Sequence, residues 1–367
     1  MAAKDLPAGT IVALRPGLWR VGVPDPLQPP GTWAYVFVGD RHLGIIDPGF
    51  DSPAARRVWA AVIARVGRRT AMAPTVLVTH VHPERPSIAG WLARRLGGTW
   101  GLAAAEWHAL RHVGTWTEAD RVAWFGRLGL DPTTARAVAA GWMAGVTGLE
   151  AACPVALGTV RRMGADRLKG WWTPGHTPGH HVFVAVGRGE WFTGDLVLAT
   201  VTPNVSWVPG GPADPLGAYL SALRTLRRLA PRTIYPAHGP VPDAAPTALR
   251  LLHHHATRLR TMLGLLTVPR TVAEVAEAVF GLGRRSAADQ RRALGETLAH
   301  LEYAVRRGMA VRLLGGEPTP VTCRLETLPG DRGPLRYGRG PGGTPDGVAD
   351  GDRNPRPEAA APADHGR

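Results

Sequence analysis

The sequence predicts an α/β fold that carries a C-terminal extension. In residues 1–246, short apolar segments with the composition of strands alternate with amphipathic helical segments. Histidines and aspartates follow the ends of several of these strands, which is where α/β folds build their sites. With 367 residues, 44% of them apolar, the chain is long enough for two domains and a sizeable core.

The first hundred residues contain both kinds of element. Gly39 and Asp40 favour a hairpin turn between two of the strands. Strands are expected at Thr10–Leu14, Trp33–Val38, Leu43–Asp47, Pro74–Thr79 and Thr99–Leu102, and helices at Ala54–Val66 and Pro86–Leu96.

Residues 103–150 differ in character, because they are rich in helical pattern and contain four spaced tryptophans. We expect a helical cap inserted into the α/β frame. The frame then resumes with strands at Arg167–Trp172, His181–Val186, Glu190–Gly194 and Thr233–Pro236, and with an amphipathic helix at Leu216–Leu229.

The C-terminal part predicts a winged-helix domain at residues 247–325. Thr271 and Glu274 have the spacing of a capping box at the start of a helix. Three helices and a two-stranded wing are expected, at Thr247–Leu266, Thr271–Phe280, Ala287–Arg307, Met309–Leu314 and Val321–Leu325. Residues 326–367 are rich in Gly and Pro without apolar periodicity, and predict a disordered tail.

Composition narrows the class of protein. The net charge of +14 permits binding to nucleic acid, but the basic residues are scattered arginines, with Lys4 and Lys169 the only lysines, so a basic binding face is not favoured. The sequence contains no apolar run long enough to span a membrane and no secretory signal pattern. Two distant cysteines, Cys153 and Cys323, do not suit a disulfide framework, so a cytoplasmic protein is expected.

Five short motifs carry the residues suited to metal chemistry. Two histidines one residue apart on a tight loop after a strand can point both imidazoles at one ion. The motifs, in chain order, are Asp47-Pro48-Gly49, His80-Val81-His82-Pro83-Glu84-Arg85, Gly175-His176-Thr177-Pro178-Gly179-His180, Thr193-Gly194-Asp195 and Pro236-Ala237-His238-Gly239.

Together the five motifs resemble those of the metallo-beta-lactamase superfamily, whose metal loop has the form His-x-His-x-Asp-His. The resemblance extends through the predicted winged helix and is nearest to bacterial lactamase-like hydrolases that carry one. It implies a four-layer αββα sandwich at residues 1–246, with the helical cap inserted at about 103–150.

The resemblance implies that His80, His82 and His176 hold a zinc ion with a fourth position open for water. Asp195 would ligate this ion or bridge to a second one. A second site would need Glu84, Arg85 and His238, but a guanidinium remains protonated and offers no lone pair. We therefore expect one zinc ion per chain, with Asp195 and His238 completing or orienting the site.

The altered loop leaves two alternatives for catalysis. Glu84 could act as a base, together with Asp195, or it could be held by Arg85 and lost to the reaction. Arg85 could itself bind an anionic group of a substrate. Asp47 and His180 are expected to hydrogen-bond to the ligand-bearing segments rather than to the metal.

The three consecutive histidines His253–His255 do not suit a metal site. Successive helical residues point about 100° apart, so their imidazoles cannot converge on one ion. We expect one of them to line the mouth of the site and the others to lie on the helix surface.

The leading functional prediction is a mononuclear zinc hydrolase, similar to the glyoxalase-II-like group, that acts on a small ester or thioester. Two alternatives remain open. One is a catalytically weak or silent relative that binds a ligand. The other is a metal-dependent ribonuclease, although cleavage of phosphodiesters generally favours two metal ions.

Overall fold

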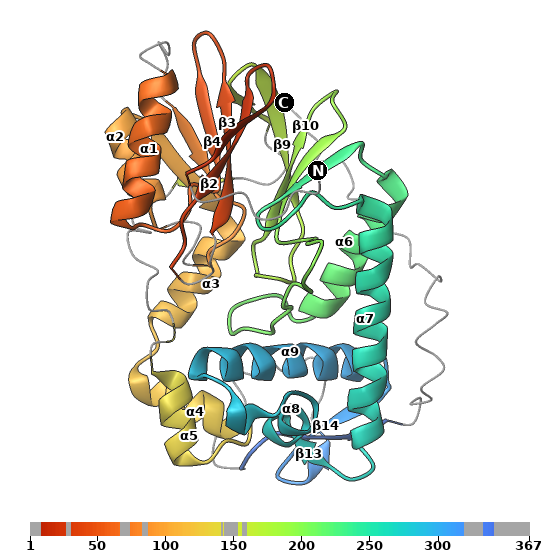
Figure 1. Cartoon of the computed structure of the whole chain (residues 1–367). Helices are drawn as coiled ribbons and strands as arrows, with labels where there is room; N and C mark the ends of the chain where they lie inside the picture. The colour runs from red at the N-terminus through yellow and green to blue at the C-terminus, as the bar shows by residue number, and fades with distance from the viewer. Residues whose placement is uncertain are drawn as a thin grey trace, which may run out of the picture.

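The computed structural model describes residues 9–26, 31–66, 74–82, 87–140, 142, 153–155, 160–318 and 333–340. Two β-sheets face each other, and helices cover the outer face of each (Figure 1). Among the described residues, no helix has both the length and the apolar character needed to cross a membrane.

The first sheet has antiparallel strands in its first half and parallel strands in its second. Helices α1 (Pro53–Val66) and α2 (Ala89–Leu96) cover its outer face and bury Trp59 and Leu92 against strand residues such as Val76. In order, the strands are β1 (Ile11–Arg15), β2 (Leu18–Val23), β3 (Thr32–Val38), β4 (Leu43–Ile46), β5 (Thr75–Leu77), β6 (Thr99–Ala103) and β7 (Cys153–Val155).

The second sheet lies against the inner face of the first. Between the sheets, the ring of Phe192 makes edge contacts with Tyr35 and Phe37 at centroid distances of 5.1 and 4.9 Å. Helix α6 (Pro215–Leu229) covers the outer face, so the layers follow the expected αββα order. The strand order is β12 (Thr233–Pro236), β11 (Glu190–Gly194), β10 (His181–Ala185), β9 (Asp166–Trp172) and β8 (Val160–Met163).

The described part of the segment expected to be a helical insertion contains three helices: α3 (Ala104–Gly114), α4 (Glu118–Arg127) and α5 (Pro132–Ala139). Thr117 begins α4 with a capping box, and the Asp131 carboxylate accepts two backbone N–H groups at the start of α5. Side-chain caps of this kind satisfy the donors that a helix leaves free at its first turn.

Helices α7 (Ala244–Leu265), α8 (Val272–Phe280) and α9 (Ala287–Arg306) form the C-terminal part together with a small sheet. The Thr271–Glu274 capping box is confirmed. The sheet has the order β13 (Arg270–Thr271), β16 (Arg336–Arg339), β14 (Ala310–Leu314) and β15 (Glu317–Pro318).

Strand β16 corrects one expectation about the C-terminal tail. It lies within residues 326–367, which were expected to be disordered, yet it pairs with β13 and β14. The side chain of Tyr337 in this strand is buried, and so is that of Leu335, the residue before it. The second wing strand expected at Val321–Leu325 lies outside the described residues.

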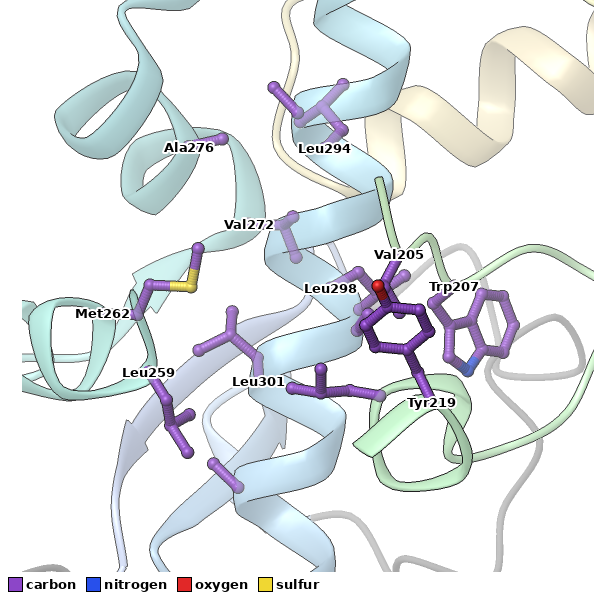
Figure 2. Packing of buried hydrophobic residues seen from close by; sticks show 14 of the residues in the cluster. Val205, Trp207, Tyr219, Leu259, Met262, Val272, Ala276, Leu294, Leu298 and Leu301 are labelled. Atoms are coloured by element: carbon purple, nitrogen blue, oxygen red, sulfur yellow. The ribbon is translucent and has the colours of Figure 1, made fainter. Parts of the chain in front are cut away.

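One hydrophobic cluster crosses the expected domain boundary at residue 246. It joins residues of α4, α5 and α6 to residues of α7, α8 and α9. Figure 2 shows part of it, where Leu298 of α9 lies between Val272 and the group formed by Val205, Trp207 and Tyr219. The frame and the C-terminal helices therefore share a core.

Candidate metal centre

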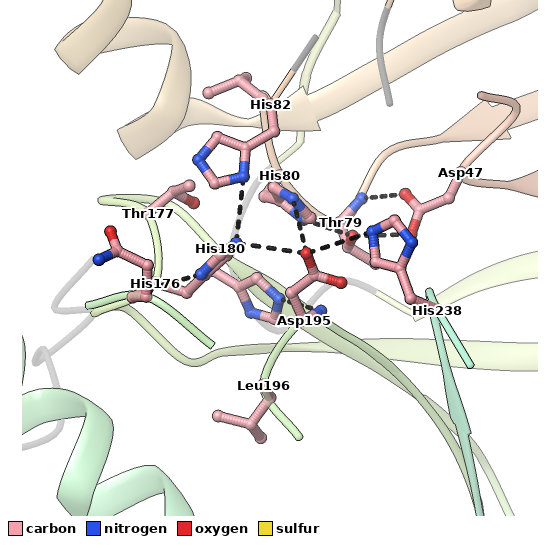
Figure 3. A network of polar contacts seen from close by, with 12 residues as sticks. Asp47, Thr79, His80, His82, His176, Thr177, His180, Asp195, Leu196 and His238 are labelled. Atoms are coloured by element: carbon pink, nitrogen blue, oxygen red, sulfur yellow. Dashed lines mark hydrogen bonds and ion pairs between the residues drawn. The ribbon is translucent and has the colours of Figure 1, made fainter. Parts of the chain in front are cut away.

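The polar residues at the ends of the strands converge on one point, as Figure 3 shows. His80 and His82 follow β5, His176 lies in the connection from β9 to β10, and Asp195 directly follows β11. Each of these four residues offers one ligand atom, and the four atoms lie within 4.8 Å of one another.

The spacing of the ligand atoms fits one divalent ion. Nε2 of His176 lies 3.2 Å from Nδ1 of His82 and 3.4 Å from Oδ2 of Asp195. Nε2 of His80 lies 3.6 Å from the same carboxylate oxygen. Tetrahedral bonds of about 2 Å hold ligand atoms roughly 3.3 Å apart, so these residues suit the coordination of a single ion.

The tautomer of His80 is set by the residue before it. The Thr79 hydroxyl donates to Oδ2 of Asp47 at 2.8 Å, so it accepts a hydrogen bond from the N–H at Nδ1 of His80 at 3.0 Å. The lone pair of Nε2 is then directed into the cluster. Asp47 also accepts the backbone N–H of Thr79 at 2.8 Å, so its carboxylate holds the metal loop by two contacts.

His176 is oriented in the same manner by the loop that follows β11. Its Nδ1 lies 2.7 Å from the backbone carbonyl of Asn204 and donates to it, which leaves Nε2 for the cluster. A second polar partner of this kind fixes the ring of a metal-binding histidine and raises its basicity.

His180 and His238 stand in different relations to the cluster. Nε2 of His180 accepts the backbone N–H of Asp195 at 3.1 Å and its Nδ1 donates to Thr173 at 2.8 Å, so both of its nitrogens are used. Burial lowers the pKa of His180, which keeps it neutral. Nε2 of His238 lies 3.7 Å from Oδ2 of Asp195, at the edge of the group.

A glycine permits the close approach around Asp195. A Cβ at Gly194 would lie 2.7 Å from Oγ1 of Thr79 and 2.8 Å from Nε2 of His180. Gly194 also has a φ of 52°, a conformation that glycine adopts at little cost. The Thr-Gly-Asp motif therefore lets the backbone before Asp195 pass close to Thr79 and His180.

Glu106 is a buried part of the site that the sequence analysis missed. It lies in the first turn of α3, and its carboxylate accepts hydrogen bonds from the Val81 N–H at 3.2 Å, the Gly179 N–H at 2.9 Å and the Thr177 hydroxyl. It thus joins the two loops that carry the histidines. Burial raises its pKa to about 7. A lone acid in the apolar stretch 101–107 was the signal available in the sequence.

The roles expected for Glu84 and Arg85 are not tested by the structure, and the placement expected for His255 is wrong. Glu84 and Arg85 lie outside the described residues, so their roles remain predictions. The expectation that the His253–His255 run lies at the site mouth or on the helix surface is wrong for His255. It is buried, with Nδ1 3.2 Å from Nε2 of His300 on α9, because α7 packs this face against α9.

Comparison with known proteins agrees with this geometry. The sequence profile of the metallo-beta-lactamase superfamily matches residues 27–238. A metallo-beta-lactamase family protein from Thermus thermophilus is 28% identical with a TM-score of 0.69, covering 89% of this chain and 100% of its own. A beta-lactamase domain protein from Burkholderia ambifaria is 25% identical with a TM-score of 0.72, covering 92% and 96%.

A curated relative matches over a shorter stretch. The lactamase-like protein nscB of Trichophyton verrucosum is 32% identical over 122 residues, which are 33% of this chain and 40% of that protein. The match therefore spans less than half of that relative. The family profile, by contrast, covers more than half of the present sequence and includes every candidate ligand. The chain belongs to the metallo-beta-lactamase superfamily.

Proposed function

We propose that the protein is a hydrolase that holds one zinc ion and cleaves a small ester or thioester. Membership of the superfamily and the cluster of His80, His82, His176 and Asp195 support a metal-dependent hydrolase in general. The observation that carries the proposal is the separation of 3.2–3.6 Å in three pairs of these ligand atoms, which suits their binding to one ion.

Each residue has a separate task in this proposal. The three histidines hold the ion through neutral nitrogens, and Asp195 supplies the negative charge. A zinc ion in such a site supplies Lewis acidity and lowers the pKa of coordinated water to about 7. His238, at the edge of the group, would contact the substrate or orient Asp195. Glu84 remains the candidate base, and Arg85 the candidate partner for an anionic substrate group.

The fold of the C-terminal part belongs to the same proposal. Helices α7, α8 and α9 followed by the strands β14 and β15 support a winged helix at residues 247–325. Because its core is continuous with that of the frame, we propose that it shapes the hydrolase rather than acting as a separate nucleic-acid reader.

The metal count tests the first part of the proposal. Elemental analysis of protein reloaded with zinc and desalted should give one ion per chain, and His176→Ala should hold substantially less. His253→Ala is the matched control, because His253 is exposed on α7 outside the cluster. Two tightly held ions per wild-type chain would contradict a mononuclear site.

The reaction is tested with a panel of small esters and thioesters. The zinc-loaded wild type should hydrolyse at least one of them, and His176→Ala should not. If a metal-loaded wild type cleaves none but binds members of the panel, a ligand-binding relative replaces the hydrolase. Salt-dependent binding and cleavage of RNA would favour the ribonuclease alternative.

A further inference from the structure

We propose that Glu296 of α9 is a positioning residue for His176, so that the C-terminal helices form part of the support of the metal site. The inference rests on the proposed metal binding at His80, His82, His176 and Asp195, but not on the reaction or the substrate. It assigns a role to a carboxylate that lies on a different element from every candidate ligand.

The contacts form an uninterrupted chain through Asn204. The backbone carbonyl of Asn204 accepts Nδ1 of His176 at 2.7 Å. The side chain of the same residue donates through Nδ2 to Oε2 of Glu296 at 3.0 Å. One residue therefore contacts the metal-site histidine through its backbone and α9 through its side chain.

Asn204 is held on both sides of its amide. Its Oδ1 accepts the Ser206 hydroxyl at 2.5 Å, while its Nδ2 is directed to Glu296 and to the carbonyl of Arg292 at 3.3 Å. Because a carbonyl only accepts, the contact with Arg292 fixes which end of the amide faces α9. With both ends of the amide bonded, the position of the carbonyl that orients His176 follows the position of α9.

Glu296 is buried and has a charge partner of its own. Its side chain is 12% exposed, and Oε1 lies 3.0 Å from Nη1 of Arg258 on α7. Each carboxylate oxygen thus has a separate donor, one on α7 and one on the loop that follows β11. A buried carboxylate satisfied in this way has a single favoured orientation, which suits it to fix Asn204.

The loop also docks on α9 through contacts that do not involve Glu296. The backbone N–H of Trp207 donates to the backbone carbonyl of Gly295 at 3.0 Å. A Cβ at Gly295 would lie 2.7 Å from Oγ of Ser206, so only glycine allows the loop to approach this closely. Val205 and Trp207 are buried in the shared core on either side of Ser206.

The simpler interpretation is that Glu296 only stabilises the packing of α9. Glu302 separates the two interpretations, because it is a buried carboxylate on the same helix, paired with Arg312 and hydrogen-bonded to Tyr337 at 2.7 Å. Both of these partners belong to the C-terminal sheet, on strands β14 and β16. Changing Glu302 should therefore lower stability and leave metal affinity alone.

The experiment measures zinc affinity by competition with a chromophoric chelator, with the d–d spectrum of the cobalt-loaded protein as a second readout. Glu296→Ala should weaken zinc binding about 10–100-fold, as loss of a partner that orients a metal ligand does, and should alter the cobalt spectrum. Glu296→Gln should retain more of the affinity than Glu296→Ala, because its one amide oxygen can still accept from Asn204, although its NH2 group then faces the Arg258 guanidinium. Glu302→Gln should lower the midpoint of urea unfolding without a change in affinity or spectrum.

A double-mutant cycle with Asn204→Ala tests whether Glu296 acts through Asn204. The double variant should bind zinc no more weakly than the weaker single variant, because both changes remove the same support. Additive losses, or an equal loss of affinity in Glu302→Gln, would overturn the inference. A wild type that holds no zinc overturns this inference and the proposed function together, whereas a wild type that binds zinc but cleaves no ester overturns only the proposed reaction.

Discussion

The hydroxyl of Thr79 lies between two charged or chargeable groups, 2.8 Å from Oδ2 of Asp47 and 3.0 Å from Nδ1 of His80. The hydroxyl donates its hydrogen bond to the carboxylate, so the imidazole must donate to the hydroxyl oxygen. A residue with no metal-binding atom in the cluster thus decides which nitrogen of His80 faces the metal site. Asp47, in the first of the five motifs, acts through this contact.

Thr79→Val should weaken zinc binding by about 10–100-fold while keeping the shape of the side chain. Valine cannot accept from Nδ1 of His80, so the ring is no longer fixed in the tautomer that metal binding needs. Chelator competition provides the measurement. The matched control is Thr297→Val on α9, whose buried hydroxyl has no hydrogen-bond partner among the described residues. An unchanged affinity in Thr79→Val would contradict the role given to Asp47 and Thr79.

Glu106→Gln should lower the free energy of unfolding by about 1–3 kcal/mol. The glutamine amide puts a donor where the carboxylate accepted one of three hydrogen bonds, so a buried partner such as the Gly179 N–H loses its acceptor. Urea unfolding of the metal-free protein measures the effect. Glu277→Gln is the control, because Glu277 accepts the Gly283 N–H in an exposed setting, where water replaces the lost contact. Equal effects of the two changes would contradict the joining role of Glu106.

Acid should destabilise the protein through His300. Burial lowers the pKa of His300 from 6.5 to about 4, so the unfolded chain binds its proton first. The resulting stability is present above pH 6.5 and is lost as the pH falls from 6.5 to 4, by about 3 kcal/mol for a shift of this size. Burial also lowers the pKa of the adjacent His255, which acts in the same direction.

Urea unfolding of the metal-free protein between about pH 4 and 8 measures this dependence. His300→Gln should flatten the profile in the stated window, whatever its effect on stability at neutral pH. His253→Gln, at an exposed position of α7, should leave the profile as it is in the wild type. A profile that is equally steep with and without His300 would show that other groups control the acid transition.

Gly175→Ala should lower the free energy of unfolding by about 1–3 kcal/mol more than Gly187→Ala does, because the added methyl group overpacks its surroundings at residue 175. Both glycines have positive φ, 135° and 78°, so both alanines are strained. At Gly175, however, the added Cβ would lie 2.5 Å from Cβ of Tyr219, while at Gly187 it would meet no described atom within 4 Å. Thermal unfolding of the two variants compares them, and similar midpoints would show that the chain around His176 yields easily.

The sequence was sufficient for the parts of the site that depend on strand ends. His80, His82, His176 and Asp195 were expected to lie together because their motifs resemble those of the metallo-beta-lactamase superfamily. Each of them also follows a strand, and in the structure their ligand atoms lie close together. The hydrogen-bond partners of these residues could not be predicted from the sequence. Glu106 reaches Val81 and Gly179 across 25 and 73 residues of chain, and no local pattern encodes such contacts.

The C-terminal part shows the same limit. Its helices follow from apolar periodicity and from the Thr271–Glu274 cap. Strand β16 does not, because Arg336–Arg339 is a short segment whose pairing with β13 and β14 comes from tertiary contact. His255 was misplaced for a related reason, since its partner His300 belongs to another helix.

The cluster that joins α4 and α6 to α8 and α9 has a consequence for how the molecule loses its structure. A chain shortened after residue 246 would leave α6 without the helices α7 and α9 that pack against it, and would expose apolar surface around Tyr219, whose ring contacts His255, to water. Calorimetry of the full-length protein should accordingly record a single cooperative transition. The shortened chain should aggregate rather than remain folded as an independent N-terminal domain.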